Sequence, residues 1–243
     1  MTAHFNEKDL YHPIKSFFEA QGYIVKGEVK GCDMALVKGD EVVIVELKKN
    51  FNVTLLYQAI DRKKISNKVF AAIPRHIFAR NKAYILDILE GLKVGLIIVA
   101  LDSPSLNVEV LLFPASEKTR NNRKSRELLA EFNGRTFDGN IGGSRSTKLL
   151  TAHRERVLHI AVALEKMGPS KPAQLVKKCG CYKASGQTLR RNFYGWFINT
   201  KKGIYDLSDE GKAALNDPAF YQIAEFYRKK VDEYLQSQDI KSS

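Results

Sequence analysis

The sequence is poor in cysteine and contains no long apolar run. Its three cysteines, Cys32, Cys179 and Cys181, form an odd and unpatterned set, which argues against a disulfide scaffold and is typical of a reducing compartment. Cys179 and Cys181 also lack the two further ligands of a structural zinc site. No apolar run approaches the roughly 20 residues that cross a bilayer, and the first residues lack the apolar segment of a signal peptide. We therefore expect a cytoplasmic protein without a membrane partner.

Acidic residues are also scarce relative to basic ones. The chain has 27 Asp and Glu against 39 Lys and Arg, which gives a formal charge of +12 and a pI near 9.5. Such a charge favours polyanions, and nucleic acid first. The length of 243 residues allows one large domain or two small ones, and an apolar content of 44% is enough to form a core.

The most informative stretch predicts a β-hairpin with acids on both strands. Residues 42–45 form an unbroken apolar run, typical of a central strand, and residues 34–37 are its expected partner. Between them, the Gly-Asp pair at 39–40 is a good type II′ turn. Counting residues from that turn places Asp33 directly opposite Glu46.

The expected face of this hairpin carries the chemistry of a metal site. Opposed carboxylates, with Cβ atoms roughly 5 Å apart, destabilise each other unless a cation lies between them. Lys48 shares the face of Glu46, whereas Leu47 points into packing and offers its carbonyl oxygen. Asp33, Glu46 and the Leu47 carbonyl could therefore hold Mg²⁺ or Mn²⁺, with Lys48 orienting water and neutralising a phosphate. The alternative is a surface hairpin whose Glu46 and Lys48 are solvated.

The rest of the first half alternates helices and strands around this hairpin. Leading strands followed by crossover helices predict a mixed sheet flanked by helices. The expected helices cover residues 10–21, 50–66 and 77–92, and the further strands cover residues 23–29, 69–73, 94–101 and 108–113.

A basic stretch separates the two halves of the chain. Residues 118–126 carry five Lys or Arg and no acid, and residues 137–146 are rich in glycine and serine. We therefore divide the chain into a first domain at 1–115, a partly ordered linker at 116–149 and a second domain at 150–243. The linker side chains expected on a nucleic-acid backbone are Arg120, Arg123, Lys124 and Arg126.

The last hundred residues predict a winged helix-turn-helix, a mostly helical domain with a short hairpin. The expected helices cover residues 151–167, 172–179, 185–194, 209–215 and 218–236, and the expected strands cover residues 196–199 and 204–207. As the recognition helix, residues 185–197 would bring Arg190 and Arg191 to phosphates or guanines, with Lys201 and Lys202 on the flanking backbone. Dimerisation or packing against the first domain is the alternative role.

Two further expectations concern apolar side chains in this half. Phe193, Trp196 and Phe197 are expected in the core of the domain rather than as platforms for bases. The apolar side of the helix at 218–236 needs a partner surface, either on the first domain or on a second subunit.

Asp33 with Glu46-Leu47-Lys48 resembles the signature of the PD-(D/E)XK nucleases. End to end, the chain is similar to a bacterial family of PD-(D/E)XK phosphodiesterases that is named from its fold and motif. The similar segments are DLYHPIKSFFEAQGY, GCDMALV, VIVELKK, YQAIDR, DGNIGGS, LRRNFYGWF and GIYDLS. The resemblance implies a restriction-endonuclease-like sheet in the first domain.

The resemblance also implies two further site residues. Many enzymes of this fold carry a glutamate on the first helix that holds a second metal or a metal-bound water, and Glu7 is the candidate, with Glu19 and Glu28 as rivals. In several lineages a glutamine on the helix after the lysine reaches the active site, and Gln58 stands at that place. Solvated polar positions are the alternative for each.

The sequence therefore predicts a metal-dependent nuclease or phosphodiesterase. Its expected substrate is DNA, with RNA as an alternative that no residue excludes, and a homodimer would supply two sites for cutting both strands. The alternative is a non-catalytic DNA-binding regulator or scaffold that keeps the nuclease fold with structural acids.

Overall fold

The chain folds into two compact units. The structure, a computed structural model, describes residues 5–101, 107–115, 122–137, 140 and 150–240. The N-terminal unit runs to Gly134, and the C-terminal unit comprises Arg135–Phe137 and the residues from Leu150 onward. No helix in these described ranges is long and apolar enough to cross a membrane.

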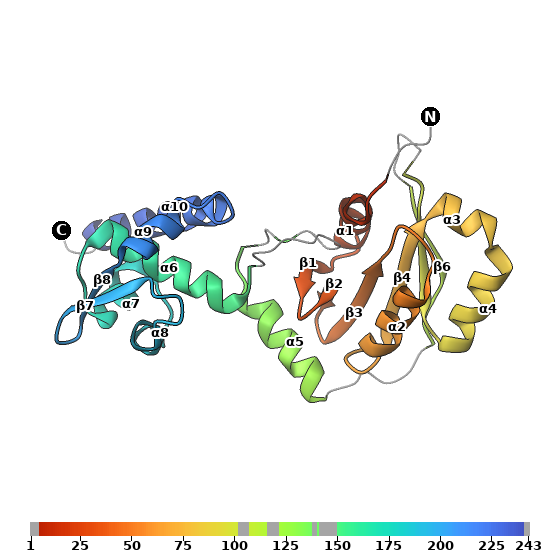
Figure 1. The fold of residues 1–243 in the computed structure, drawn as a ribbon, viewed down its shortest axis with the longest axis horizontal. Coiled ribbons are helices and arrows are strands. Elements are labelled where there is room, and N and C mark those ends of the chain that lie inside the picture. The colour runs from red at the N-terminus through yellow and green to blue at the C-terminus, as the bar shows by residue number, and fades with distance from the viewer. Residues whose placement is uncertain (1–4, 102–106, 116–121, 138–139, 141–149, 241–243) are drawn as a thin grey trace. The chain divides into compact units, whose positions relative to one another are not determined.

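The N-terminal unit is built on one mixed six-stranded sheet, whose strands lie in chain order (Figure 1). The first three strands and the last pair are antiparallel, whereas β3, β4 and β5 are parallel. This order agrees with the expected mixed sheet. The strands are β1 (Ile24–Val29), β2 (Cys32–Lys38), β3 (Glu41–Leu47), β4 (Lys68–Pro74), β5 (Gly95–Val99) and β6 (Val108–Leu112).

Helices cover both faces of this sheet, so its central strands alternate between two cores. On β3, Val43 and Val45 face the core that contains helix α1 (Tyr11–Glu19), and Val42 and Ile44 face the opposite core. The short helix η1 (Glu7–Leu10) precedes α1. The second core is covered by α2 (Val53–Arg62), α3 (Arg75–Arg80), α4 (Lys82–Leu92) and α5 (Arg123–Gly134).

One expected helix is in fact two. The single helix expected at residues 77–92 breaks at Asn81, whose φ of −139° and ψ of 36° are not helical. Asparagine is unfavourable inside a helix because its side chain competes for backbone hydrogen bonds. The break lets α3 bury Phe78 and α4 bury Ile85 and Leu89 from separate directions.

Helix α5 lies inside the stretch expected as a linker. Its Leu128 and Phe132 are buried in the core beneath the sheet. Lys26 Nζ on β1 donates to the Phe132 carbonyl at 2.7 Å. This half of the basic stretch is therefore part of the N-terminal unit, while Arg120 and nearly all of the Gly/Ser-rich segment lie outside the described residues.

The C-terminal unit packs its helices around α6 (Ala152–Met167). Thr151 caps this helix by accepting from the Arg154 backbone N–H at 3.2 Å, and Gly168 follows its end. The unit also contains α7 (Pro172–Cys179), α8 (Ser185–Arg191), β7 (Phe197–Lys201), β8 (Ile204–Leu207), α9 (Asp209–Leu215) and α10 (Tyr221–Ile240). Its order of three helices and a hairpin matches the expected elements.

Two expectations for this unit are wrong. The apolar side of α10, with Ile223, Tyr227 and Val231, packs on α6 and α7 of its own unit rather than on the first domain or a second subunit. Phe193 is 80% exposed, although Trp196 and Phe197 are buried as expected. Helix α8 ends before Phe193 because Asn192 adopts the left-handed conformation, with φ of 42°.

Candidate active site

The hairpin of β2 and β3 brings the two acids to one end of the sheet. Lys38 pairs with Glu41, which confirms the turn at 39–40, and Gly39 has the positive φ of 58° that this turn requires. Asp33 lies at the start of β2, and its Oδ2 accepts the Leu47 backbone N–H at 2.8 Å. The carboxylate is therefore tied to the end of β3.

Lys48 follows the last residue of β3 and contacts three oxygen atoms. Its Nζ lies 3.6 Å from Asp33 Oδ2 and 3.3 Å from Glu7 Oε2, and it donates to the Leu47 carbonyl at 2.8 Å. Its backbone N–H donates to the Ala72 carbonyl at 3.1 Å, which holds it against β4. The ammonium thus neutralises two acids at the end of a buried strand.

Of the three first-helix candidates, Glu7 lies at this cluster. Glu7 begins η1, and its carboxylate is paired with Lys48. Glu19 pairs instead with Lys15 at 3.6 Å, one turn along α1. Glu28 lies on β1 with a positive φ of 52°.

Glu46 is fully buried and is paired with Arg62, a residue that the sequence alone did not single out. Arg62 Nε donates to Glu46 Oε1 at 2.6 Å. The guanidinium also donates to the Gly31 carbonyl and to Asp61 Oδ2. Glu46 Oε2 is buried and has no hydrogen-bond partner among the described residues.

Burial dominates the electrostatics of the two acids. It raises the pKa of Glu46 to about 7, with the neighbouring Asp33 carboxylate adding to the shift and Arg62 opposing it. Burial also raises the pKa of Asp33, against the opposing effect of Lys48 and of the Leu47 hydrogen bond. A cation beside these acids would favour the charged form of both.

Gln58 stands one turn before Arg62 on α2. It is half-buried, and its side-chain oxygen is buried without a partner in the described part of the chain. The spacing of four residues places the two side chains on the same face of the helix. That spacing was the signal in the sequence that could have indicated Arg62.

The donor atoms at this end of the sheet fit a hard divalent cation. Such ions bind oxygen, commonly through one or two carboxylates with water and substrate phosphate completing the shell. Asp33, Glu46 and the Leu47 carbonyl provide oxygens of this kind, and the buried Glu46 Oε2 has no hydrogen-bond partner among the described residues. Within the described ranges no three His, Cys, Asp or Glu side chains gather closely enough to hold a metal by themselves.

A cavity of about 500 Å³ lies next to the segment that follows Lys48. Phe51, Arg80 and Tyr84 are among its lining residues, and none of the predicted site residues is. The cavity is therefore adjacent to the catalytic candidates in sequence but is not formed by them.

The predicted nucleic-acid residues are mostly exposed. Arg190 and Arg191 lie in the last turn of α8, and Lys201 and Lys202 lie at the tip of the β7–β8 hairpin. On α5, Arg123, Lys124 and Arg126 are exposed, and Arg123 pairs with Glu127 at 2.7 Å. These cations are available to a polyanion in each unit.

The fold is consistent with a PD-(D/E)XK-like protein, because it has a mixed sheet with the acids and the lysine at one end. Comparison with known families supports the nuclease or phosphodiesterase class. A family model described as "Putative PD-(D/E)XK phosphodiesterase (DUF2161)" matches residues 97–214, just under half of the chain. Over these residues the chain is similar to that family, which agrees with the resemblance that its motifs suggested. The match begins after Asp33, Glu46, Lys48 and Gln58, so their assignment depends on geometry. Comparisons with curated proteins and with solved structures gave no significant match.

Proposed function

We propose that the chain is a Mg²⁺- or Mn²⁺-dependent phosphodiesterase that hydrolyses DNA internally. The observation that carries this proposal is the Lys48 ammonium, held within 3.6 Å of Asp33 beside a buried Glu46 with an unpartnered oxygen. When bound by Asp33, Glu46 and the Leu47 carbonyl, the metal would supply a water of lowered pKa and charge for the phosphate.

The remaining roles in the reaction would belong to side chains of the protein. Asp33 is held in place by the Leu47 N–H, and Arg62 fixes one oxygen of Glu46. Lys48 would orient the attacking water and neutralise the charge that develops on the phosphate. Water would attack phosphorus in line: its oxygen forms the new P–O bond as it loses a proton, and the opposite P–O bond breaks as the leaving sugar oxygen takes up a proton.

Glu7 and Gln58 would have supporting roles. Glu7 contacts Lys48 and would set the position of its ammonium or hold a second water. Gln58 carries a buried unpartnered oxygen on the same helix as Arg62 and would be a further ligand or water contact.

The C-terminal unit would position the DNA as a winged helix-turn-helix. Helix α8 would enter the major groove with Arg190 and Arg191, and Lys201 and Lys202 would hold the flanking backbone. A homodimer would place one active site on each strand. The protein would act in the cytoplasm, where its free and buried cysteines would stay reduced.

The second candidate function is a non-catalytic DNA-binding scaffold. The Arg62–Glu46 pair favours it, because a protein cation already occupies one oxygen of that acid. Melting temperature distinguishes the two. In an enzyme Mn²⁺ should raise it, and Asp33→Asn with Glu46→Gln should abolish the rise. In a scaffold neither effect should appear.

The cleavage test uses supercoiled, linear, single-stranded and branched DNA, together with RNA, in Mg²⁺ or Mn²⁺. Lys48→Ala should lose cleavage, whereas its matched control Lys49→Ala, which changes an exposed lysine at the next position, should keep it. Cleavage that persists in Lys48→Ala purified in the same way would refute the assignment. Cleavage of RNA alone would refute the choice of DNA.

A further inference from the structure

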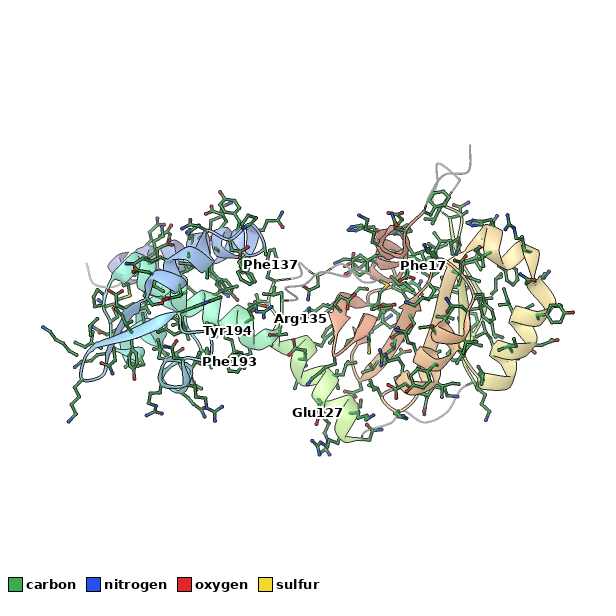
Figure 2. All side chains as sticks on the ribbon, viewed as in Figure 1. Phe17, Glu127, Arg135, Phe137, Phe193 and Tyr194 are labelled. Atoms are coloured by element: carbon green, nitrogen blue, oxygen red, sulfur yellow. The ribbon has the colours of Figure 1, made fainter. Side chains whose placement is uncertain are left out.

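The turn between α8 and β7 displays an aromatic ring on the surface. Phe193 is 80% exposed, whereas the next residue, Tyr194, is half-buried and packs against the core of the unit. The two rings lie side by side (Figure 2), with centroids 5.1 Å apart and planes at 89°. Most of the Phe193 side chain is therefore open to solvent.

Hydrogen bonds hold this turn in one conformation. Asn192 Nδ2 donates to the Phe197 carbonyl at 2.7 Å, and Asn192 Oδ1 accepts the Phe197 N–H at 3.1 Å. The Gly195 N–H donates to the Asn192 carbonyl at 3.0 Å, and Ser208 Oγ donates to the Gly195 carbonyl at 2.7 Å. Phe193 is therefore presented by an ordered turn, which lowers the entropy lost when a ligand binds.

The neighbouring rings meet Phe193 at a steep angle. His153 lies with its centroid 6.5 Å away and its plane at 85°. Tyr194 in turn packs against Trp196 at 5.1 Å. Neither contact with Phe193 is parallel, so neither of these two rings stacks on it.

Several arginines lie near this aromatic group. Arg191 and Arg190 are exposed on the last turn of α8, and the Arg154 guanidinium lies 5.5 Å from the Tyr194 centroid. The pKa of His153 is lowered by burial and by the charges of Arg156, Arg191 and Arg154, which places these cations close to the ring beside Phe193. An exposed aromatic ring among cations has the composition of a single-strand binding site.

We propose that Phe193 is a stacking platform for an unpaired base of DNA, with Arg190 and Arg191 on the adjacent phosphates. Stacking needs an open base face, and inside a duplex both faces of each base are covered by its neighbours. The surface around Phe193 should therefore take single-stranded DNA or an unpaired end. This inference rests on the proposed DNA substrate and adds a second mode of binding, in which Arg190 and Arg191 contact the phosphates of an unpaired strand or end rather than the major groove of a duplex.

The test measures binding of the full chain in EDTA, so that no DNA is cut. The probes are a fluorescein-labelled 20-mer and the same strand in a duplex, followed by anisotropy. Phe193→Ala should weaken binding to the single strand about tenfold, equivalent to about 1.4 kcal/mol, and should change duplex binding less than about twofold. Phe193→Trp should bind the single strand as well as the wild type does. Phe193→Leu, which is apolar but has no π-face, should bind as weakly as Phe193→Ala.

The matched control is Tyr221→Ala, which removes another exposed aromatic ring of the same unit and should leave both affinities unchanged. Equal weakening on the single strand and the duplex would overturn the proposal, as would full binding by Phe193→Leu or Phe193→Ala. Self-association that Phe193→Ala abolishes, with unchanged DNA affinity, would assign the surface to a second copy instead. Because no cleavage is measured, this result is independent of whether the chain is a nuclease.

Discussion

The Arg62–Glu46 pair provides the sharpest test of the site's electrostatics. Glu46 is fully buried and the side chain of Arg62 is 13% exposed, so solvent screens their interaction weakly. Arg62→Met keeps most of the side-chain length but leaves the carboxylate without its cation. Breaking a buried pair in this way costs about 3 kcal/mol or more when the remaining group stays charged. At pH 8, one unit above the wild-type pKa of Glu46 of about 7, the carboxylate of the variant can take up a proton instead, so we expect a loss of about 1.4 kcal/mol or more.

At pH 6 the loss should be smaller. Glu46 is then largely protonated even in the wild type, so Arg62 faces a neutral group. The double variant Arg62→Met/Glu46→Gln should recover most of the stability at pH 8, since no buried charge remains. Mn²⁺ should stabilise Arg62→Met more than the wild type, because a metal can take the place of the lost guanidinium.

The assay is urea unfolding in EDTA, followed by two signals. Far-UV circular dichroism reports on both units, whereas Trp196, the single tryptophan of the chain, reports on the C-terminal unit alone. The urea midpoint of the Trp196 signal should not change in Arg62→Met. Lys64→Met, which removes an exposed ion pair just after the same helix, should change the stability of the N-terminal unit little. A loss below about 1 kcal/mol at pH 8, or the same loss at pH 6, would refute the reasoning.

Two pH dependences of stability should run in opposite directions in the two units. Burial raises the pKa of Glu46 to about 7, so the folded N-terminal unit keeps a proton that the unfolded chain releases near 4.5. Its free energy of unfolding should therefore fall by roughly 3 kcal/mol as the pH rises from 4.5 to 7. Glu46→Gln should flatten this pH dependence in the dichroism signal. Burial lowers the pKa of His159 to about 4, and its Nε2 lies 3.0 Å from the Cys179 carbonyl. The free energy of unfolding of the C-terminal unit, followed through Trp196, should therefore fall by roughly 3 kcal/mol as the pH falls from 6.5 to 4. His159→Phe should remove that dependence. A rise of stability with pH in the first case, or an unchanged acid limb in His159→Phe, would contradict the respective assignment.

The hairpin was predictable because its turn and its pattern agree. A Gly-Asp pair accepts the backbone of a two-residue turn, and the unbroken run at 42–45 requires a strand covered on both faces. Those two facts fix the register, and the register brings Asp33 to the end of β3. Helices that begin with a capping residue, such as α6 after Thr151, could equally be predicted from the sequence.

What the sequence could not give are contacts between distant segments. Arg62 and Glu46 are 16 residues apart, and their pairing depends on how α2 lies on the sheet. Helix α5 reads as a basic connection, yet Leu128 and Phe132 find an apolar surface beneath β1. Phe193 has the residue type of a core position, but the left-handed Asn192 ends its helix and turns the ring outward. Each outcome depends on tertiary context rather than on local pattern.

The position of β3 in the sheet explains why the candidate groups converge. β3 is antiparallel to β2 and parallel to β4, so the start of β2 and the ends of β3 and β4 meet at one edge. In open sheets with parallel strands, ligands bind beyond the carboxyl ends of those strands. Lys48 lies at that edge, held by the Ala72 carbonyl. A register shift of one residue between β2 and β3 would turn Asp33 to the opposite face of the sheet from Glu46. Because the two-residue turn sets this register, the turn that closes the hairpin also brings the acids together with the lysine.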